Sequence, residues 1–171
     1  DDYYTERRVP RMDCAALLLE HRSSTLDESY TVLERSHVHH YEAAGEEFTR
    51  ARLEGLFDLV VTAIGNRDLA GVSAYAVNVA EERFKAGFDI SEVQAAFNAL
   101  EQAMWRQIVE SSPAADLAEA TGLMSTVLGF GKDVLARTYV SLASRRHVRS
   151  LDLTAMFAGT QAHPEQTEHL A

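Results

Sequence analysis

Apolar residues recur along this chain at intervals of three and four positions, and no stretch shows the sustained apolar and polar alternation of a β-strand. The pattern predicts five helices, which run from about Met12 to Arg35, from about Ala43 to Ile64, from about Leu69 to Lys85, from just after Asp89 to Ser111, and from Pro113 to about Arg149. We therefore expect an all-α fold, a single-domain helical bundle of about five helices with a long C-terminal helix.

The segment around Gly87 carries the clearest local signal. Glycine takes the positive φ that often ends a helix, and Asp89 can cap the next helix while Glu92 reaches back to the amide of the capping residue. Phe88 and Val93 flank this cap at the spacing of a hydrophobic staple. These residues predict two helices joined by a tight turn.

Capping residues mark two further helix boundaries. The first helix can break at 23–24, because Thr25 and Glu28 form a possible capping box. The fifth helix is expected to start with Ser112 as its cap and Pro113 at its first position, where the missing N–H of proline costs nothing.

The fifth helix has a broad apolar arc, so we expect it to lie centrally or to serve two contacts at once. Gly122, Ser125 and Gly129 form a strip of small residues along it. A neighbouring helix can approach such a strip closely, although each glycine costs about 1 kcal/mol in helix propensity. We therefore expect close packing at this strip.

The 171 residues suffice for one domain that buries its own core. We divide the chain into an N-terminal extension at 1–11, a helical domain at 12–158 and a polar C-terminal tail at 159–171. We find no apolar run of membrane-spanning length and no secretory signal, so we expect no membrane partner. Cys14 is the only cysteine, which agrees with a reducing compartment and a cytoplasmic location.

Charge and motifs exclude several classes of function. The formal net charge is −10, whereas nucleic-acid binding depends on lysines and arginines that neutralise phosphates. We therefore expect no nucleic-acid partner. The sequence also lacks the GxSxG, P-loop and GxGxxG motifs, and we assign no catalytic residue.

His37, His40 and Glu34 are the densest cluster of possible metal ligands. If their segment is helical, they share one face, and a site of two histidines and one carboxylate is conceivable. The HExxH context is missing, however, and a polar helix end explains the same residues. We favour the reading without a metal or cofactor and keep the metal site as the alternative.

Seven residues are candidates for contact with a partner: Trp105, Arg83, Arg145, Arg146, Arg149, Met156 and Phe157. Arg83 follows a buried stripe closely enough to be partly covered, and it could tie the turn to another helix through a carboxylate or carbonyl. Trp105 suits either the rim of the core or a ligand. The arginines complement the dipole of a helix end or meet an acidic partner, and the last two residues belong to an amphipathic stub.

The stretch ERFKAGFDISEVQAAFNALEQAMWRQI resembles the RsbRD-type N-terminal sensor domain, an all-helical family attached in bacteria to stressosome co-antagonists, histidine kinases and PucR-like regulators. The similarity runs from about Leu17 to Leu142. Its core is the pattern of Glu82, Arg83, Ala86, Gly87, Phe88, Leu100 and Trp105. We find no STAS, kinase or helix-turn-helix region after the long helix, which departs from the usual arrangement of the family. We therefore expect either a free-standing version of the sensor domain or an output module that lies outside this chain.

The resemblance implies a non-enzymatic sensory or regulatory domain at 12–158, with no shared catalytic residues. We expect it to bind a regulatory protein partner or a small ligand, to signal through the packing of the fourth and fifth helices, and to form a homodimer. One alternative is a small metal-binding or cofactor-binding protein or enzyme that uses His37, His40 and Glu34. A purely structural scaffold is the other.

Overall fold

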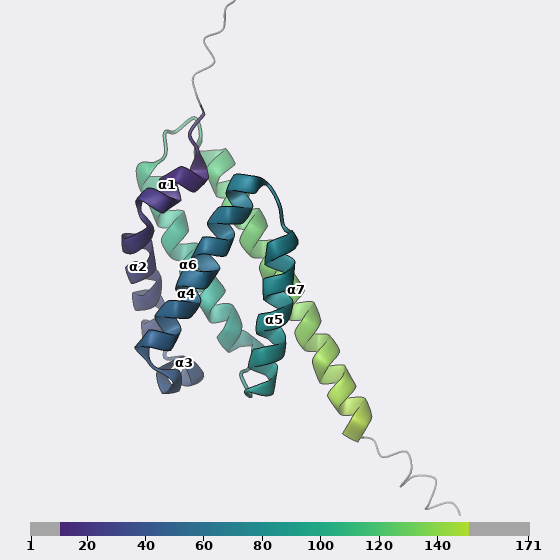
Figure 1. The fold of residues 1–171 in the computed structure, drawn as a ribbon. Helices are drawn as coiled ribbons and strands as arrows, with labels where there is room; N and C mark the ends of the chain where they lie inside the picture. Colours follow the sequence, from purple (N-terminus) through teal and green to yellow (C-terminus); the bar gives the residue numbers. More distant parts are fainter. Residues whose placement is uncertain (1–10, 151–171) are drawn as a thin grey trace, which may run out of the picture.

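The computed structural model describes the backbone of residues 11–150 and the side chains of residues 11–145. This part of the chain forms seven α-helices and no strand (Figure 1). The helices are α1 (Cys14–Glu20), α2 (Arg22–Arg35), α3 (His39–Ala44), α4 (Glu46–Asn66), α5 (Ala70–Lys85), α6 (Ile90–Ser111) and α7 (Leu117–Ser150). The all-α prediction and the long last helix are confirmed. The predicted tail at 159–171 lies outside the described residues, so the domain division stays a prediction.

The first predicted helix is divided at His21, which ends α1 and begins α2. The capping box predicted at Thr25 is wrong, because Thr25 lies inside α2 and its hydroxyl donates to the His21 carbonyl oxygen at 2.9 Å. Glu28 instead forms an ion pair with Arg106 of α6 at 2.6 Å. This pair joins α2 to α6, along which α2 packs.

The short helix α3 is an element that the apolar pattern did not predict. It lies between two residues with positive φ, His37 at 49° and Gly45 at 88°, so the backbone turns sharply at both ends. Tyr41 of α3 is buried in the core. The second predicted helix therefore begins at Glu46, as α4, rather than at Ala43.

The reversal between α5 and α6 forms as the sequence predicts. Gly87 has a φ of 85°, and the amide of Phe88 donates to the carbonyl oxygen of Arg83 at 3.0 Å, which closes a Schellman turn. Asp89 caps α6, and the carboxylate of Glu92 accepts a hydrogen bond from the Asp89 amide at 2.9 Å. The turn thus satisfies backbone groups that both helix ends leave unpaired.

α7 begins later than predicted. Ser112 ends α6, and Pro113 opens a turn in which the Asp116 amide donates to the Pro113 carbonyl oxygen at 2.9 Å. The carboxylate of Asp116 also accepts a hydrogen bond from the amide of Met12 at 3.3 Å. A contact with the N-terminal part of the chain therefore accompanies this turn, and the helix itself starts at Leu117.

The helices form one bundle in which α6 and α7 lie behind α2, α4 and α5 in the view of Figure 1. α5 packs along α7, α2 packs along α6, and α4 contacts every other helix. The largest fully buried side chains come from α1, α2 and the four long helices, and they include Phe57, Leu100, Met104, Leu128 and Leu135.

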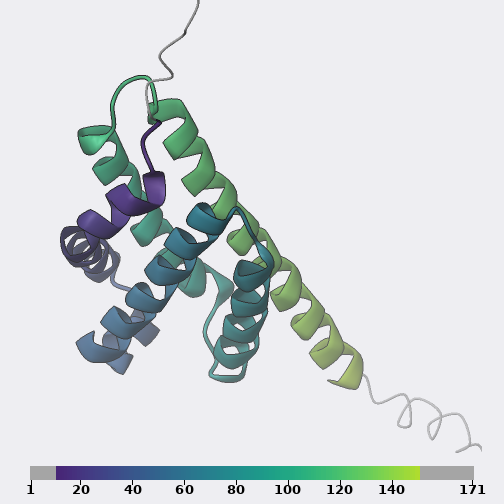
Figure 2. The same ribbon diagram turned by 45° about the horizontal axis from the view of Figure 1, so that its top comes forward.

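α7 serves more than one contact, as predicted, because α4, α5 and α6 all pack against it. Its C-terminal end projects beyond the other helices, which Figure 1 and Figure 2 show from two directions. The side chain of Val140 is 65% exposed. Within residues 11–150, no helix is both long and apolar enough to cross a membrane.

The small-residue strip of α7 does not pack against a neighbouring helix. Its members are all exposed: Gly122, Ser125 and Gly129. The close approach occurs instead at Gly131, where a Cβ atom would lie 3.0 Å from Phe97 Cε1 and 3.2 Å from Val72 Cγ1. Among residues 11–145 the expectation of close packing at the strip is therefore wrong, because the buried face of α7 is the one that carries Gly131.

Alanine substitutions at Gly129 and Gly131 test which face of α7 is buried. Gly129→Ala should raise the free energy of unfolding by about 0.5 to 1 kcal/mol, because alanine favours a helix and the added Cβ would meet no atom of a neighbouring described helix within 4 Å. Gly131→Ala should lower it by about 1 kcal/mol, since its Cβ presses on the buried side chains of Phe97 and Val72. Urea denaturation followed by circular dichroism measures both values, and equal effects would contradict this assignment.

Candidate functional site

Arg83, in the last turn of α5, is the one charged residue that lies in the interior of residues 11–145. It is 6% exposed and follows Val79 and Ala80 on the buried side of the helix. The sequence predicted partial cover, and the structure buries the residue almost completely. Arg83 is therefore not an exposed contact residue, and its burial needs a physical explanation because a charge is costly to remove from water.

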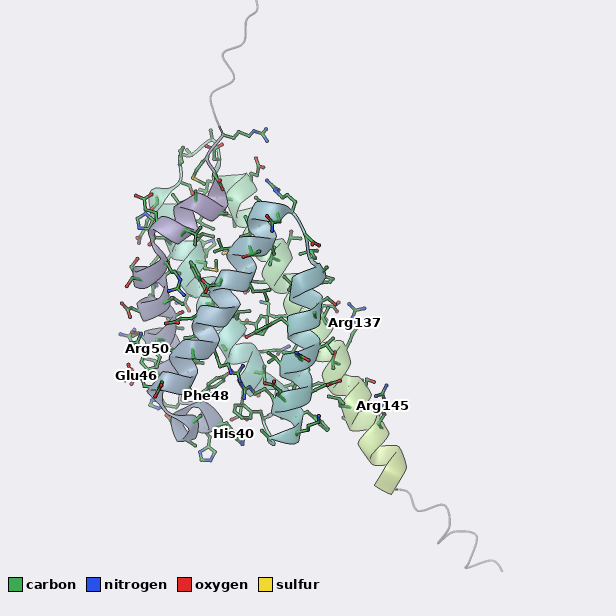
Figure 3. All side chains as sticks on the ribbon, viewed as in Figure 1. His40, Glu46, Phe48, Arg50, Arg137 and Arg145 are labelled. Carbon is green, nitrogen blue, oxygen red and sulfur yellow. The ribbon has the colours of Figure 1, made fainter. Side chains whose placement is uncertain are left out.

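Two aromatic rings pack against the guanidinium of Arg83. Its central carbon lies 4.7 Å from the ring centroid of Phe48, at the start of α4, and 5.1 Å from that of Phe88, in the turn after α5. Figure 3 shows Phe48 and His40 at the end of the bundle where α3 lies. Cation–π contacts of this kind stabilise a desolvated cation by about 2 kcal/mol each.

One edge of the guanidinium has no hydrogen-bond partner. Arg83 Nε and Nη2 are buried, and no described residue accepts a hydrogen bond from either atom. Arg83 also forms no ion pair with a carboxylate among residues 11–145. The expected tie to another helix through a carboxylate or carbonyl is therefore not made by these two atoms, and the rings of Phe48 and Phe88 make the contact instead.

Three tyrosines complete the surroundings of Arg83, namely Tyr41, Tyr75 and Tyr139. Burial raises the pKa of Tyr41 and that of Tyr139 to about 12, although the positive charge of Arg83 opposes both shifts. Burial raises the pKa of Tyr75 as well. These phenols are neutral at physiological pH and supply no negative charge. We call the six residues the Arg83 cluster: Arg83, Phe48, Phe88, Tyr41, Tyr75 and Tyr139.

The charged groups nearest the cluster do not neutralise Arg83. Burial lowers the pKa of Arg83, and the positive charge of Arg52 lowers it further, yet an arginine keeps its proton at neutral pH. The carboxylate of Glu82 is 56% exposed and pairs with Arg52 at 3.6 Å. The cluster is therefore a buried, positively charged spot in a chain whose net charge is −10.

Beside the cluster, Glu92 joins α3 to the start of α6. Its Oε2 lies 2.7 Å from His40 Nδ1 and accepts the Asp89 amide at 2.9 Å, and His40 stacks on Phe88 with 4.4 Å between centroids. Burial alone would raise the pKa of Glu92, but the hydrogen bonds from His40 and Asp89 outweigh it and hold this pKa below its ordinary value. Glu92 therefore stabilises the docking of α3 in its ionised form.

The structure separates the predicted metal ligands. Glu34 and His37 line a cavity of about 340 Å³ between α2, α3 and α4, and His37 pairs with Glu42 at 3.0 Å. His40 does not line this cavity and pairs with Glu92. Among the described residues, no group of three or more histidine, cysteine or acidic side chains could hold a metal ion. The shared helical face is lost because α2 ends at Arg35 and the chain turns before α3.

The remaining candidates for partner contact lie on α6, on α7 and beyond. Trp105 is 49% exposed, and Val109, one helical turn later, is 41% exposed, so α6 presents a small apolar patch to solvent. Arg145 is exposed on the projecting end of α7 (Figure 3). The side chains of Arg146 and Arg149, and both Met156 and Phe157, lie outside the described residues.

Sequence reasoning found Arg83 but missed the residues that surround it. Arg83 extends the apolar spacing of α5, which is a local signal. Phe48, Tyr41 and Tyr139 come from α4, α3 and α7, and no periodicity along the chain connects them with α5. Phe88 is the exception, because a Schellman turn places the residue after its glycine beside the helix end.

Residues 24–152 match the model of a protein family described as the RsbT co-antagonist protein rsbRD N-terminal domain. The match spans most of the chain, including α3 to α7 and the whole Arg83 cluster. Comparisons with curated proteins and with solved structures found no match.

The role of Glu92 can be tested by Glu92→Gln, which removes the charge and keeps the size. At pH 7 we expect the free energy of unfolding to fall by about 1 kcal/mol, because hydrogen bonds to a charged acceptor become neutral ones. The pKa of Glu92 is lower in the folded state, so its stabilisation is present above the ordinary value of 4.5 and is lost as the pH falls through the folded value. The difference between the two proteins should therefore vanish in acid.

Urea denaturation at pH 7 and at successively lower pH measures this difference. Glu110→Ala serves as the control, because Glu110 is exposed on the same helix and its removal should change stability by less than about 0.5 kcal/mol. If the difference in the free energy of unfolding between Glu92→Gln and the unaltered protein stays constant as the pH falls, the charge of Glu92 does not cause it.

Proposed function

Since this chain belongs to the family of rsbRD N-terminal domains, we propose that it is a non-enzymatic sensory module of the cytoplasm. The family is one of sensory and regulatory domains related to the stressosome. In this proposal the domain binds a regulatory protein or a small ligand. Binding changes the packing of α6 and α7, and α7 transmits this change.

The observation that carries the proposal is the link between the Arg83 cluster and α7. The hydroxyl of Tyr139, a residue of α7, donates to the carbonyl oxygen of Phe88 at 3.4 Å. The rings of Phe84 and Tyr139 also meet edge to face, with 5.7 Å between centroids. A shift of the turn between α5 and α6 therefore displaces a side chain of the helix that projects from the bundle.

Signalling through packing requires two arrangements of the helices and a stimulus that binds them with different affinity. The Arg83 cluster suits this role because a buried charge without a counter-ion makes the local packing costly. A stimulus that compensates the charge favours one arrangement over the other.

We place the second copy of a homodimer against the exposed side of α7. Val140 is the most exposed large apolar side chain among the described residues, and the small-residue strip on this helix is also exposed. Arg145, at the projecting end, also suits the acidic surface of a second copy, since the net charge is −10. The regulatory protein partner then binds the exposed apolar patch of Trp105 and Val109 on α6.

Truncation after Leu142 tests the role of α7 in dimerisation. We expect the shortened chain to dimerise more weakly, because it loses Arg145 but keeps Val140 and the small-residue strip. Its helical content should be largely unchanged, because the end of α7 projects beyond the other helices. Sedimentation velocity measures the mass, and circular dichroism measures the helical content.

Two substitutions in the full chain serve as a matched pair for this test. Val140→Arg should weaken the dimer, whereas Val109→Arg, at an exposed valine of α6, should leave it intact. Unchanged association after truncation would reject the role of Arg145, and unchanged association in Val140→Arg would reject the dimer through α7. Loss of the dimer in Val109→Arg alone would move the interface to α6.

A further inference from the structure

We infer that Arg83 binds the carboxylate group of a small organic monoanion, and that its Nε and Nη2 atoms each donate a hydrogen bond to one carboxylate oxygen. The inference rests on the proposed sensory function and names the chemistry of its ligand. It is carried by three observations, which concern the geometry of the guanidinium edge, the charge balance around it and the aromatic lining of the Arg83 cluster.

The geometry is set by the two unpaired donors. Nε and Nη2 lie on the same edge of the guanidinium, and this edge matches the two oxygens of a carboxylate. The same protein shows the arrangement on its surface, where Arg22 Nε lies 3.1 Å from Asp58 Oδ1 and Arg22 Nη2 lies 3.2 Å from Asp58 Oδ2. Arg83 presents the same pair of donors in the interior, where no side chain among residues 11–145 takes the place of Asp58.

One negative charge on the ligand would balance the positive charge of Arg83. A buried donor without a partner destabilises the folded state, and the cost is larger when the group is charged. The contacts with Phe48 and Phe88 compensate the charge through the ring faces and leave the donating edge unpaired. A single carboxylate supplies two strong acceptors and one negative charge, which match the two donors and the one positive charge of Arg83.

The lining favours an organic anion with an apolar body over a bare inorganic ion. Three phenylalanine or tyrosine rings, those of Phe48, Phe88 and Tyr41, contact Arg83 or one another, and the phenols remain neutral. The second positive charge, on Arg52, is already paired with Glu82 at the surface. A phosphate dianion would therefore bring one negative charge that no buried cation neutralises.

Entry of the ligand couples binding to helix packing. Because Nε and Nη2 are buried, a neighbouring ring must move to admit a carboxylate. Phe48 is only partly buried and stands at the start of α4, directly after the turn at Gly45, so its ring is the one best placed to move. The bound state then differs from the free state in the contacts between α4 and the turn that holds Phe88.

The test uses the full chain and three probes at equal ionic strength: sodium benzoate, sodium chloride and inorganic phosphate. We expect benzoate to raise the Tm saturably and the other two to leave it unchanged. Arg83→Lys keeps a positive charge but lacks the two-donor edge, so the apparent affinity for benzoate should fall by about tenfold or more. Arg22→Lys is the matched control and should bind benzoate as the unaltered protein does.

A second measurement covers the case in which Arg83→Lys fails to fold. In the unaltered protein, the assigned Nε–H resonance of Arg83 should shift on titration with benzoate, while that of Arg22 should not. The inference is overturned by the absence of a saturable shift, by equal binding in Arg83→Lys, or by an equal effect of phosphate. If these outcomes occur while Val140→Arg still weakens the dimer, the ligand assignment fails and the proposed dimer through α7 stands.

Discussion

Gly87, with its φ of 85°, reverses the chain between α5 and α6, and the hydrogen bond from the Phe88 amide to the Arg83 carbonyl oxygen closes the turn. A residue with a Cβ atom would be strained at this φ. The reversal sets the directions in which α5 can lie along α7 and α6 along α2. It also brings the ring of Phe88 against the side chain of Arg83. The turn that organises the bundle therefore supplies one of the two rings that pack against the guanidinium.

At position 83, the side chain that would be best for stability differs from the arginine that the protein carries. An apolar side chain of similar length would fill the same space without the cost of desolvating a charge, and such replacements are often neutral or stabilising. Packing alone therefore does not require a guanidinium at this position. The rings of Phe48 and Phe88 reduce the cost, and the unpaired Nε and Nη2 atoms leave part of it in place. A ligand or partner that accepts hydrogen bonds from these two atoms would recover the free energy that their unpaired burial costs the unliganded domain.

The link from this site to the rest of the molecule passes through short polar contacts between helix ends. Glu92 caps α6 and holds His40 of α3, and Tyr139 of α7 donates to the carbonyl oxygen of Phe88. Each contact joins a different helix to the Gly87 turn. The turn is therefore the place where α3, α5, α6 and α7 meet, which is what a sensory domain needs if one event is to reach a projecting helix.

The sequence by itself determined the long helices, the Gly87 turn and the cap at Asp89, because each depends on residues within about one helical turn of one another. It indicated partial cover of Arg83, whereas the nearly complete burial of this residue depends on side chains from distant helices. Only the tertiary structure decided the break at His21, the short helix α3 and the separation of His37 from His40, since these follow from contacts between distant segments. The choice of Gly131 over Gly129 as the buried glycine belongs to the same class. The apolar periodicity of α7 indicates how much of its surface is buried. Which side of the helix packs against which neighbour is decided only when the whole chain folds.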